Sequence, residues 1–228
     1  LPQSGPVLIM PDLALLSLLC SKLCHDLVGP VSAIGNGVEI LEEEDDPAMQ
    51  KQAVELLAHS ANLAANRLKF MRLAFGAAGG EGVAISLTEA RQTANDFLID
   101  GRGKLNWPVV EDEDALGVDK TGVKILLNLI MIANDTIPRG GTVGVSLRRD
   151  EENGQAVIHT VVRSEGANAR LGEGVEDALD TASDSNALNP KSAPARLAAN
   201  LAQTFGQTIF VMPHVDSVEF TVGLTPNG

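Results

Sequence analysis

The sequence predicts an α+β fold, in which a hairpin of two long helices is followed by an α/β sandwich. Apolar residues recur at steps of three and four through the first part of the chain, as in helices that pack along one face. After it, apolar runs of strand length alternate with helical segments. The glycine-rich stretch GAAGGEG separates the two parts. We therefore expect a helical-hairpin domain over residues 12–76 and a sandwich domain over residues 84–226.

The composition argues against a nucleic-acid binder. With 30 acidic and 17 basic residues the net charge is -13, which repels phosphate backbones and favours protein partners. Cys20 and Cys24 lie one helical turn apart, where a disulfide has poor geometry, and two thiols without further ligands make a poor metal site. We expect both to be reduced packing residues, as in a cytosolic protein.

The hydropathy of the chain predicts a soluble protein, and the reduced cysteines indicate the cytoplasm. Its longest nearly apolar stretch, VKILLNLIMIA from Val123, contains a lysine and an asparagine and is shorter than the roughly 20 residues of a membrane span. The opening LPQSGPVLIMP has neither the basic start nor the full apolar core of a secretion signal, and we assign it no function.

Each helix of the predicted hairpin has one continuous apolar seam. The first helix runs from Asp12, a plausible N-cap, to about Asp45; after the acidic turn, Asp46 and Pro47 are a good cap and first position for the second helix. The seam residues of the first helix are Leu16, Cys20, Leu23, Leu27, Val31, Ile34, Val38 and Leu41. Those of the second helix are Val54, Leu57, Ala61, Ala64, Leu68, Met71 and Phe75, in heptad spacing.

Two antiparallel helices cannot bury both seams by themselves. The simplest arrangement adds a second copy of the chain, which makes a four-helix bundle around a two-fold axis. The sequence therefore predicts a homodimer. The alternative is that the C-terminal part of the same chain covers the seams, which we consider less favoured because both seams run the full length of the hairpin.

His25 is predicted to face solvent. It lies two residues from each of the seam positions Leu23 and Leu27, so at about 100° per residue it points away from both. Pro30 removes a hydrogen bond to the carbonyl of Asp26 and should bend the helix. An exposed imidazole beside a bend indicates a site. Its neighbours are mostly small, so a partner protein could approach the ring closely; they are Ser21, Lys22, Val28, Gly29, Ser32 and Ala33.

The segment HDLVGPVSAIGNGVEIL, from His25 to Leu41, resembles the phosphoacceptor helix of sensor histidine kinases. In that family a histidine is followed by an acidic residue, an apolar residue and, five places on, a proline. Here these positions are His25, Asp26, Leu27 and Pro30. The resemblance implies that His25 carries a phosphoryl group.

The second part of the chain resembles the ATP-binding domain of the same kinases. We expect a helix from the capping box Ser86 to Glu89 through Phe97, a strand at WPVVED, and a long helix from about Asp119 to Thr136. The strands TVGVSLRR and AVIHTVVR, a helix around Pro194 to Phe205, and the strands TIFVM and VEFTVGL complete the sandwich.

The nucleotide-binding positions of that family are altered. NLIMIANDTIPRGG, from Asn128 to Gly141, lines up with the asparagine box, but the magnesium-binding asparagine falls on Ile132, which cannot ligate a hard cation. The adenine-binding aspartate falls near Ser164. The glycine-rich turn beside the phosphates falls on Ser192, Ala193, Pro194 and Ala195. These losses imply a fold that is kept without ATP or a metal of its own.

The combination is similar to the dimeric histidine phosphotransferases of the alphaproteobacterial cell-cycle phosphorelay. That similarity implies that His25 shuttles a phosphoryl group between receiver-domain aspartates of a hybrid histidine kinase and of response regulators, with magnesium supplied by the receiver. Asp26 either accepts the second ring N–H and fixes the tautomer or is a solvated carboxylate. Lys22 is expected to be a surface lysine, although it could lie near the phosphoryl oxygens.

Two other functions stay open, an atypical ATP-dependent histidine kinase and a noncatalytic dimeric scaffold. The remaining histidines lack the neighbours of His25. We expect packing or surface roles for His59 and His159 and a turn for His214.

Overall fold

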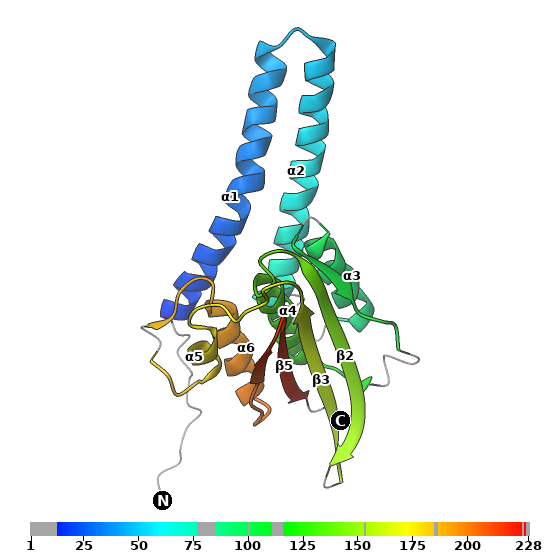
Figure 1. Ribbon diagram of the computed structural model, residues 1–228, viewed down its shortest axis with the longest axis vertical. Coiled ribbons are helices and arrows are strands. Elements are labelled where there is room, and N and C mark those ends of the chain that lie inside the picture. Colours follow the sequence, from blue (N-terminus) through cyan, green and yellow to red (C-terminus); the bar gives the residue numbers. More distant parts are fainter. Residues whose placement is uncertain are drawn as a thin grey trace, which may run out of the picture.

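The hairpin stands away from the sandwich in the computed structural model, which describes residues 13–76, 85–99, 101–110, 116–152, 154–184, 187–224 and 226 (Figure 1). Three expected features lie outside these residues: the cap Asp12, the linker after Gly76, and the acidic end of WPVVED.

Helices α1 (Leu13–Glu43) and α2 (Pro47–Ala74) form the predicted hairpin. The Asp46 side chain accepts a hydrogen bond from the Ala48 N–H at 3.1 Å, and Pro47 occupies the first turn, so α2 begins as expected. Helix α1 continues through Pro30, which is buried.

By length and composition, α1 is the one helix in the described part of the chain that could cross a membrane, with a mean hydropathy of 1.3 over 18 residues. The stretch from Val123, which the sequence analysis considered for a membrane span, lies in α4 and does not meet this criterion. A core helix of a soluble protein meets the same criterion, because a helix that packs along a bundle is also long and apolar.

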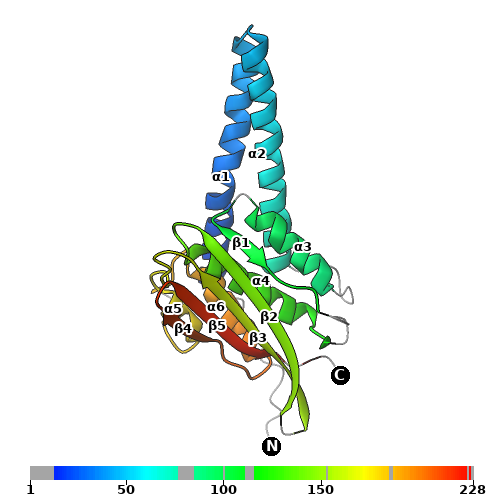
Figure 2. The ribbon, with the colours of Figure 1, turned by 45° about the vertical axis from the view of Figure 1, so that its right-hand side comes forward.

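The sandwich is a five-stranded mixed sheet with helices on one face (Figure 2). Its strands, in the order β1-β2-β3-β5-β4, are β1 (Gly103–Asn106), β2 (Gly141–Glu152), β3 (Gln155–Glu165), β5 (Ser217–Leu224) and β4 (Phe210–His214). Among these described strands, β1 and β2 pair in parallel and the other neighbours are antiparallel. The helices are α3 (Leu87–Leu98), α4 (Lys120–Asp135), α5 (Val175–Leu179) and α6 (Ala193–Gln203).

Most predicted elements of the sandwich are confirmed within two residues, and the cap of α3 is the expected one, since the Ser86 hydroxyl accepts from the Glu89 N–H. The prediction of a strand at WPVVED was wrong. The strand ends at Asn106, Trp107 is buried with Arg91 over its ring at 5.5 Å, and Pro108 has no N–H to continue a ladder. Helix α5 was missed because five residues are too short to show a period.

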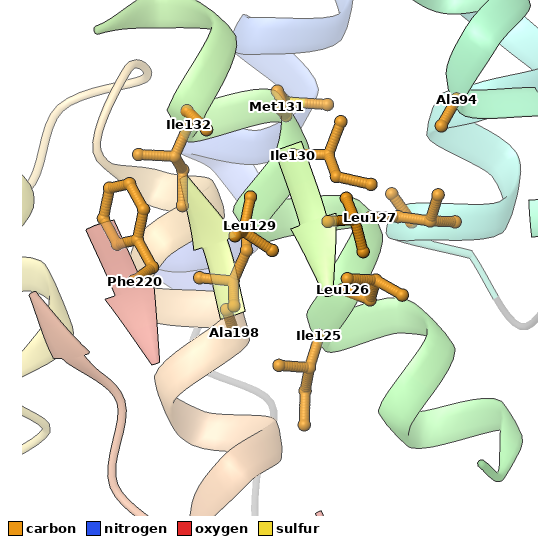
Figure 3. Close-up of a cluster of buried hydrophobic side chains, with 14 of the residues drawn as sticks. Ala94, Ile125, Leu126, Leu127, Leu129, Ile130, Met131, Ile132, Ala198 and Phe220 are labelled. Atoms are coloured by element: carbon orange, nitrogen blue, oxygen red, sulfur yellow. The ribbon is translucent and has the colours of Figure 1, made fainter. Parts of the chain in front are cut away.

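Helix α4 is the centre of the core. Its middle is buried on all sides, and Figure 3 shows its side chains with Ala198 of α6 and Phe220 of β5. The last turns of α2 enter the same core through Phe70, Met71 and Leu73.

Residues such as Gly37 and Ala53 are buried between α1 and α2, whereas the base of the hairpin packs against the sandwich. There Leu15 and Leu19 of α1 pack on Ala193 of α6. At the base of the hairpin, the C-terminal part of the same chain therefore covers α1, as in the alternative to a dimer. The predicted seam is displaced here: Leu16 and Cys20 are exposed, because α6 approaches the neighbouring face of α1.

Cys20 and Cys24 are free and exposed within the chain, so the expectation of packing was wrong for a single copy. Apolar seam residues stay exposed farther along both helices; they include Val31, Val38, Val54 and Leu68.

Candidate functional site

The site is centred on His25, whose side chain is 78% exposed on α1, as its helical position predicts. Its Nδ1 lies 3.0 Å from Oδ1 of Asp26. When Nδ1 carries the proton it donates to this carboxylate, and Nε2 is then the ring nitrogen with a lone pair. The ring is thus oriented by its neighbour in the sequence while remaining open to a partner.

Lys22 holds the other oxygen of Asp26. Its Nζ lies 2.8 Å from Asp26 Oδ2 and 3.6 Å from Oδ2 of Asp135, the last residue of α4. The expectation of a surface lysine on the docking face was wrong, since Lys22 is only 8% exposed. The reason is geometric: one turn before Asp26, the side chain passes between α1 and α4, where two carboxylates balance its charge.

The backbone of Asp26 is also held. Pro30 has no N–H to donate to the carbonyl four residues earlier. Instead, Arg67 of α2 donates from Nη1 to the Asp26 carbonyl oxygen. Three atoms of Asp26 therefore have partners, on His25, Lys22 and Arg67.

The other expected docking residues are mostly exposed on α1. Ser21, Val28, Gly29 and Ser32 are exposed and Ala33 is half-buried. Val28 is 63% exposed, which leaves an apolar side chain beside the imidazole. The Ser21 hydroxyl donates to the Ser17 carbonyl at 2.9 Å, so it is turned back onto its own helix.

The asparagine-box positions are structural. The Asn128 amide donates to the carbonyls of Ala74 at 3.0 Å and Lys124 at 2.8 Å, and so joins α4 to the end of α2. Ile132 is buried in the core. Burial, together with the charge of Lys120, lowers the pKa of Lys124 below its ordinary value.

The other two altered positions are also enclosed. The buried Ser164 hydroxyl lies 2.5 Å from the Thr136 hydroxyl and donates to the Val218 carbonyl. Ser192, Ala193, Pro194 and Ala195, at the start of α6, are all buried. These groups are therefore engaged with the core of the protein.

The remaining histidines lie apart from the site. His59 is exposed on α2, and His159 of β3 is half-buried with Nε2 3.6 Å from Asp150 Oδ2. His214 is exposed and is the last residue of β4 rather than part of the turn, since it pairs with Ser217.

Sequence reasoning missed two residues of the site, Arg67 and Asp135. Both come from other helices, and helical spacing within α1 carries no information about them. One signal was available: the carbonyl that Pro30 leaves without a helical donor needs a donor from elsewhere.

Residues 87–216, more than half of the chain, match the family described as the histidine phosphotransferase C-terminal domain. The chain belongs to this family. It is 40% identical over 142 residues to protein phosphotransferase ChpT of Brucella abortus (strain 2308), a match that spans 62% of the chain and 65% of that relative.

Among solved structures, this family member is similar to a bacterial phosphotransferase determined at 1.7 Å. The two are 30% identical with a TM-score of 0.74, over 92% of this chain and 96% of the other. The histidine kinase AdeS of Acinetobacter baumannii aligns over 90% of this chain and 98% of its own at 12% identity, with a TM-score of 0.43.

Proposed function

We propose that the chain is a histidine phosphotransferase that moves a phosphoryl group between receiver-domain aspartates through phosphohistidine at His25. The observation that carries the proposal is the exposed imidazole, hydrogen-bonded through Nδ1 to Asp26, in a chain of the histidine phosphotransferase family. This imidazole can accept a phosphoryl group at Nε2 without a rearrangement of the helix.

The transfer is an in-line displacement. The lone pair of His25 Nε2 attacks the phosphorus of a receiver's aspartyl phosphate, an N–P bond forms, and the acyl O–P bond breaks. The aspartate leaves as a carboxylate with the electron pair. The ring becomes positive as the N–P bond forms, and the Asp26 carboxylate at Nδ1 stabilises that charge. The reverse reaction with a second receiver regenerates His25.

The partners would be receiver domains of a hybrid histidine kinase and of response regulators. The surface around His25 suits them, because Ser21, Gly29 and Ser32 are small and exposed and Val28 offers an apolar contact. Magnesium would be held by the acidic pocket of the receiver. Lys22 is not part of this surface, since it is buried.

The C-terminal part would act without ATP. Three positions that bind nucleotide in sensor kinases hold Ile132, Ser164 and Pro194, and each of these residues is buried. A nucleotide would have to displace core packing or break the hydrogen bonds of Ser164.

The working form would be a cytoplasmic homodimer built on the hairpin of residues 12–76, with the sandwich of 84–226 as a second domain. The seam residues Val31, Val38, Val54 and Leu68 remain exposed in a single chain, and a second hairpin would bury them. The charged pair of Lys22 and Asp26 in the middle of α1 favours a soluble bundle over a membrane span.

The decisive experiment is phosphotransfer with a labelled receiver. We expect wild type to take the label from one phosphorylated receiver and give it to another, and His25→Gln to abolish both steps. His59→Gln, which changes an exposed histidine of α2, should transfer as wild type.

Each competing function has its own outcome in these measurements. Unchanged phosphate flow with His25→Gln would favour a scaffold. Saturable ATP binding at micromolar concentration, followed by labelling of His25 from ATP, would favour a kinase.

A further inference from the structure

The helical turn that carries His25 has a gap in its backbone hydrogen bonding. Pro30 lies inside α1 and is buried, and it has no N–H for the carbonyl of Asp26. Helix α1 by itself cannot fill this gap, because the residue that would donate is the proline.

Arg67 fills the gap from the neighbouring helix. Its half-buried guanidinium donates from Nη1 to the Asp26 carbonyl oxygen. Arginine suits this position because it is long enough to cross between helices and keeps its N–H donors at every physiological pH.

The contact falls on the residue that orients the imidazole. Asp26 accepts from His25 through Oδ1, pairs with Lys22 through Oδ2, and accepts from Arg67 through its carbonyl. We infer that Arg67 is a positioning residue for His25, which replaces the helical hydrogen bond that Pro30 removes. The inference rests on the proposed function for its rate measurement, although the geometry it describes can be measured separately.

A direct role of the Arg67 charge on the phosphoryl group or on the docked receiver predicts a different pattern of mutations. If Arg67 acts through the Asp26 carbonyl, restoring the backbone N–H at position 30 makes it dispensable. If its charge acts on the partner, restoring the N–H at position 30 leaves the effect of removing Arg67 unchanged.

The test is a double-mutant cycle of wild type, Arg67→Met, Pro30→Ala and the double variant. Methionine keeps a long apolar side chain and removes the donors. Arg72→Met, which changes an exposed arginine of the same helix, is the matched control. Two quantities are measured: the rate of transfer from a phosphorylated receiver to His25, and the tautomer of His25 from its ring ¹⁵N shifts.

We expect Arg67→Met to slow transfer about tenfold, the scale of one hydrogen bond from a charged donor, and to lower the fraction of His25 protonated at Nδ1. In the Pro30→Ala background the same change should alter the rate by less than about twofold. Arg72→Met should match wild type.

A double variant as slow as Arg67→Met would overturn the inference, and so would a rate and tautomer unchanged in Arg67→Met. If Arg67→Met does not fold, adding Pro30→Ala should restore the helical circular dichroism. A double variant that stays unfolded would count against the inference. If wild-type protein transfers nothing, the proposed function fails, and the tautomers of the four proteins still test the positioning.

Discussion

In the proposed reaction, Asp26 is the residue that orients His25. Its carboxylate lies between the imidazole and the Lys22 ammonium, and these two contacts hold it beside the ring. The sequence left two roles open for Asp26, and the geometry favours orientation over simple solvation, because its side chain is only 16% exposed.

Asp26→Asn tests this role. Asparagine keeps the shape and one acceptor but loses the charge that stabilises a positive ring, so phosphotransfer should fall about 10- to 100-fold, the scale of a hydrogen bond to a charged group. The rate of single-turnover transfer from a labelled receiver is the measurement. Glu55→Gln, at an exposed carboxylate of α2, is the control, and an unchanged rate in Asp26→Asn would show that the carboxylate is a bystander.

At the scale of elements, one glycine lets α1 and α2 approach closely near the tip of the hairpin. Gly37 is buried, and a Cβ there would lie 2.8 Å from Cγ of Leu57 on α2. Gly35, two residues earlier, has nothing within 4 Å of such a Cβ. The same helix therefore offers one glycine required by packing and one that packing within the chain does not require.

Gly37→Ala should destabilise the hairpin by about 1 kcal/mol or more, because overpacking outweighs the gain in helix propensity. Gly35→Ala should leave the melting temperature unchanged or raise it, since it gains propensity without a clash. Thermal denaturation followed by circular dichroism measures both. Equal melting temperatures for the two variants would contradict the packing of Gly37 on Leu57.

Elements with strong local signals were predictable, and those decided by neighbours were not. The caps Asp46, Ser86 and Asp119 accept the backbone bonds that their residue types predict. The strand at WPVVED failed because pairing with β2 decides where β1 lies, and local propensity does not report that pairing.

On the scale of the whole molecule, the hairpin has a base that packs on the sandwich and an outer part, here called the shaft, that carries exposed seam residues. The base is held by α6 and by the core around α4, whereas Val31, Val38 and Val54 on the shaft are exposed in one chain. Exposed apolar residues aligned along a helix are a feature of association surfaces.

If the shaft is the dimer interface, Val54→Glu should convert dimers to monomers in sedimentation velocity, because it would place charges in the bundle core. Val215→Glu is the matched control, since Val215 is 93% exposed in the turn between β4 and β5. A monomeric wild type, or a dimer that survives Val54→Glu, would show that the shaft does not form the interface.

The sequence by itself determined the helical hairpin, the exposure of His25 and most strands and helices of the α/β sandwich. These follow from periodicity, capping and a short motif, all of which act within a few residues. Only the tertiary structure decided that Lys22 is buried, that Arg67 caps the Asp26 carbonyl, and that α6 covers the base of α1. Such contacts join residues far apart in the chain, and their energies depend on how whole elements pack, which no local pattern encodes.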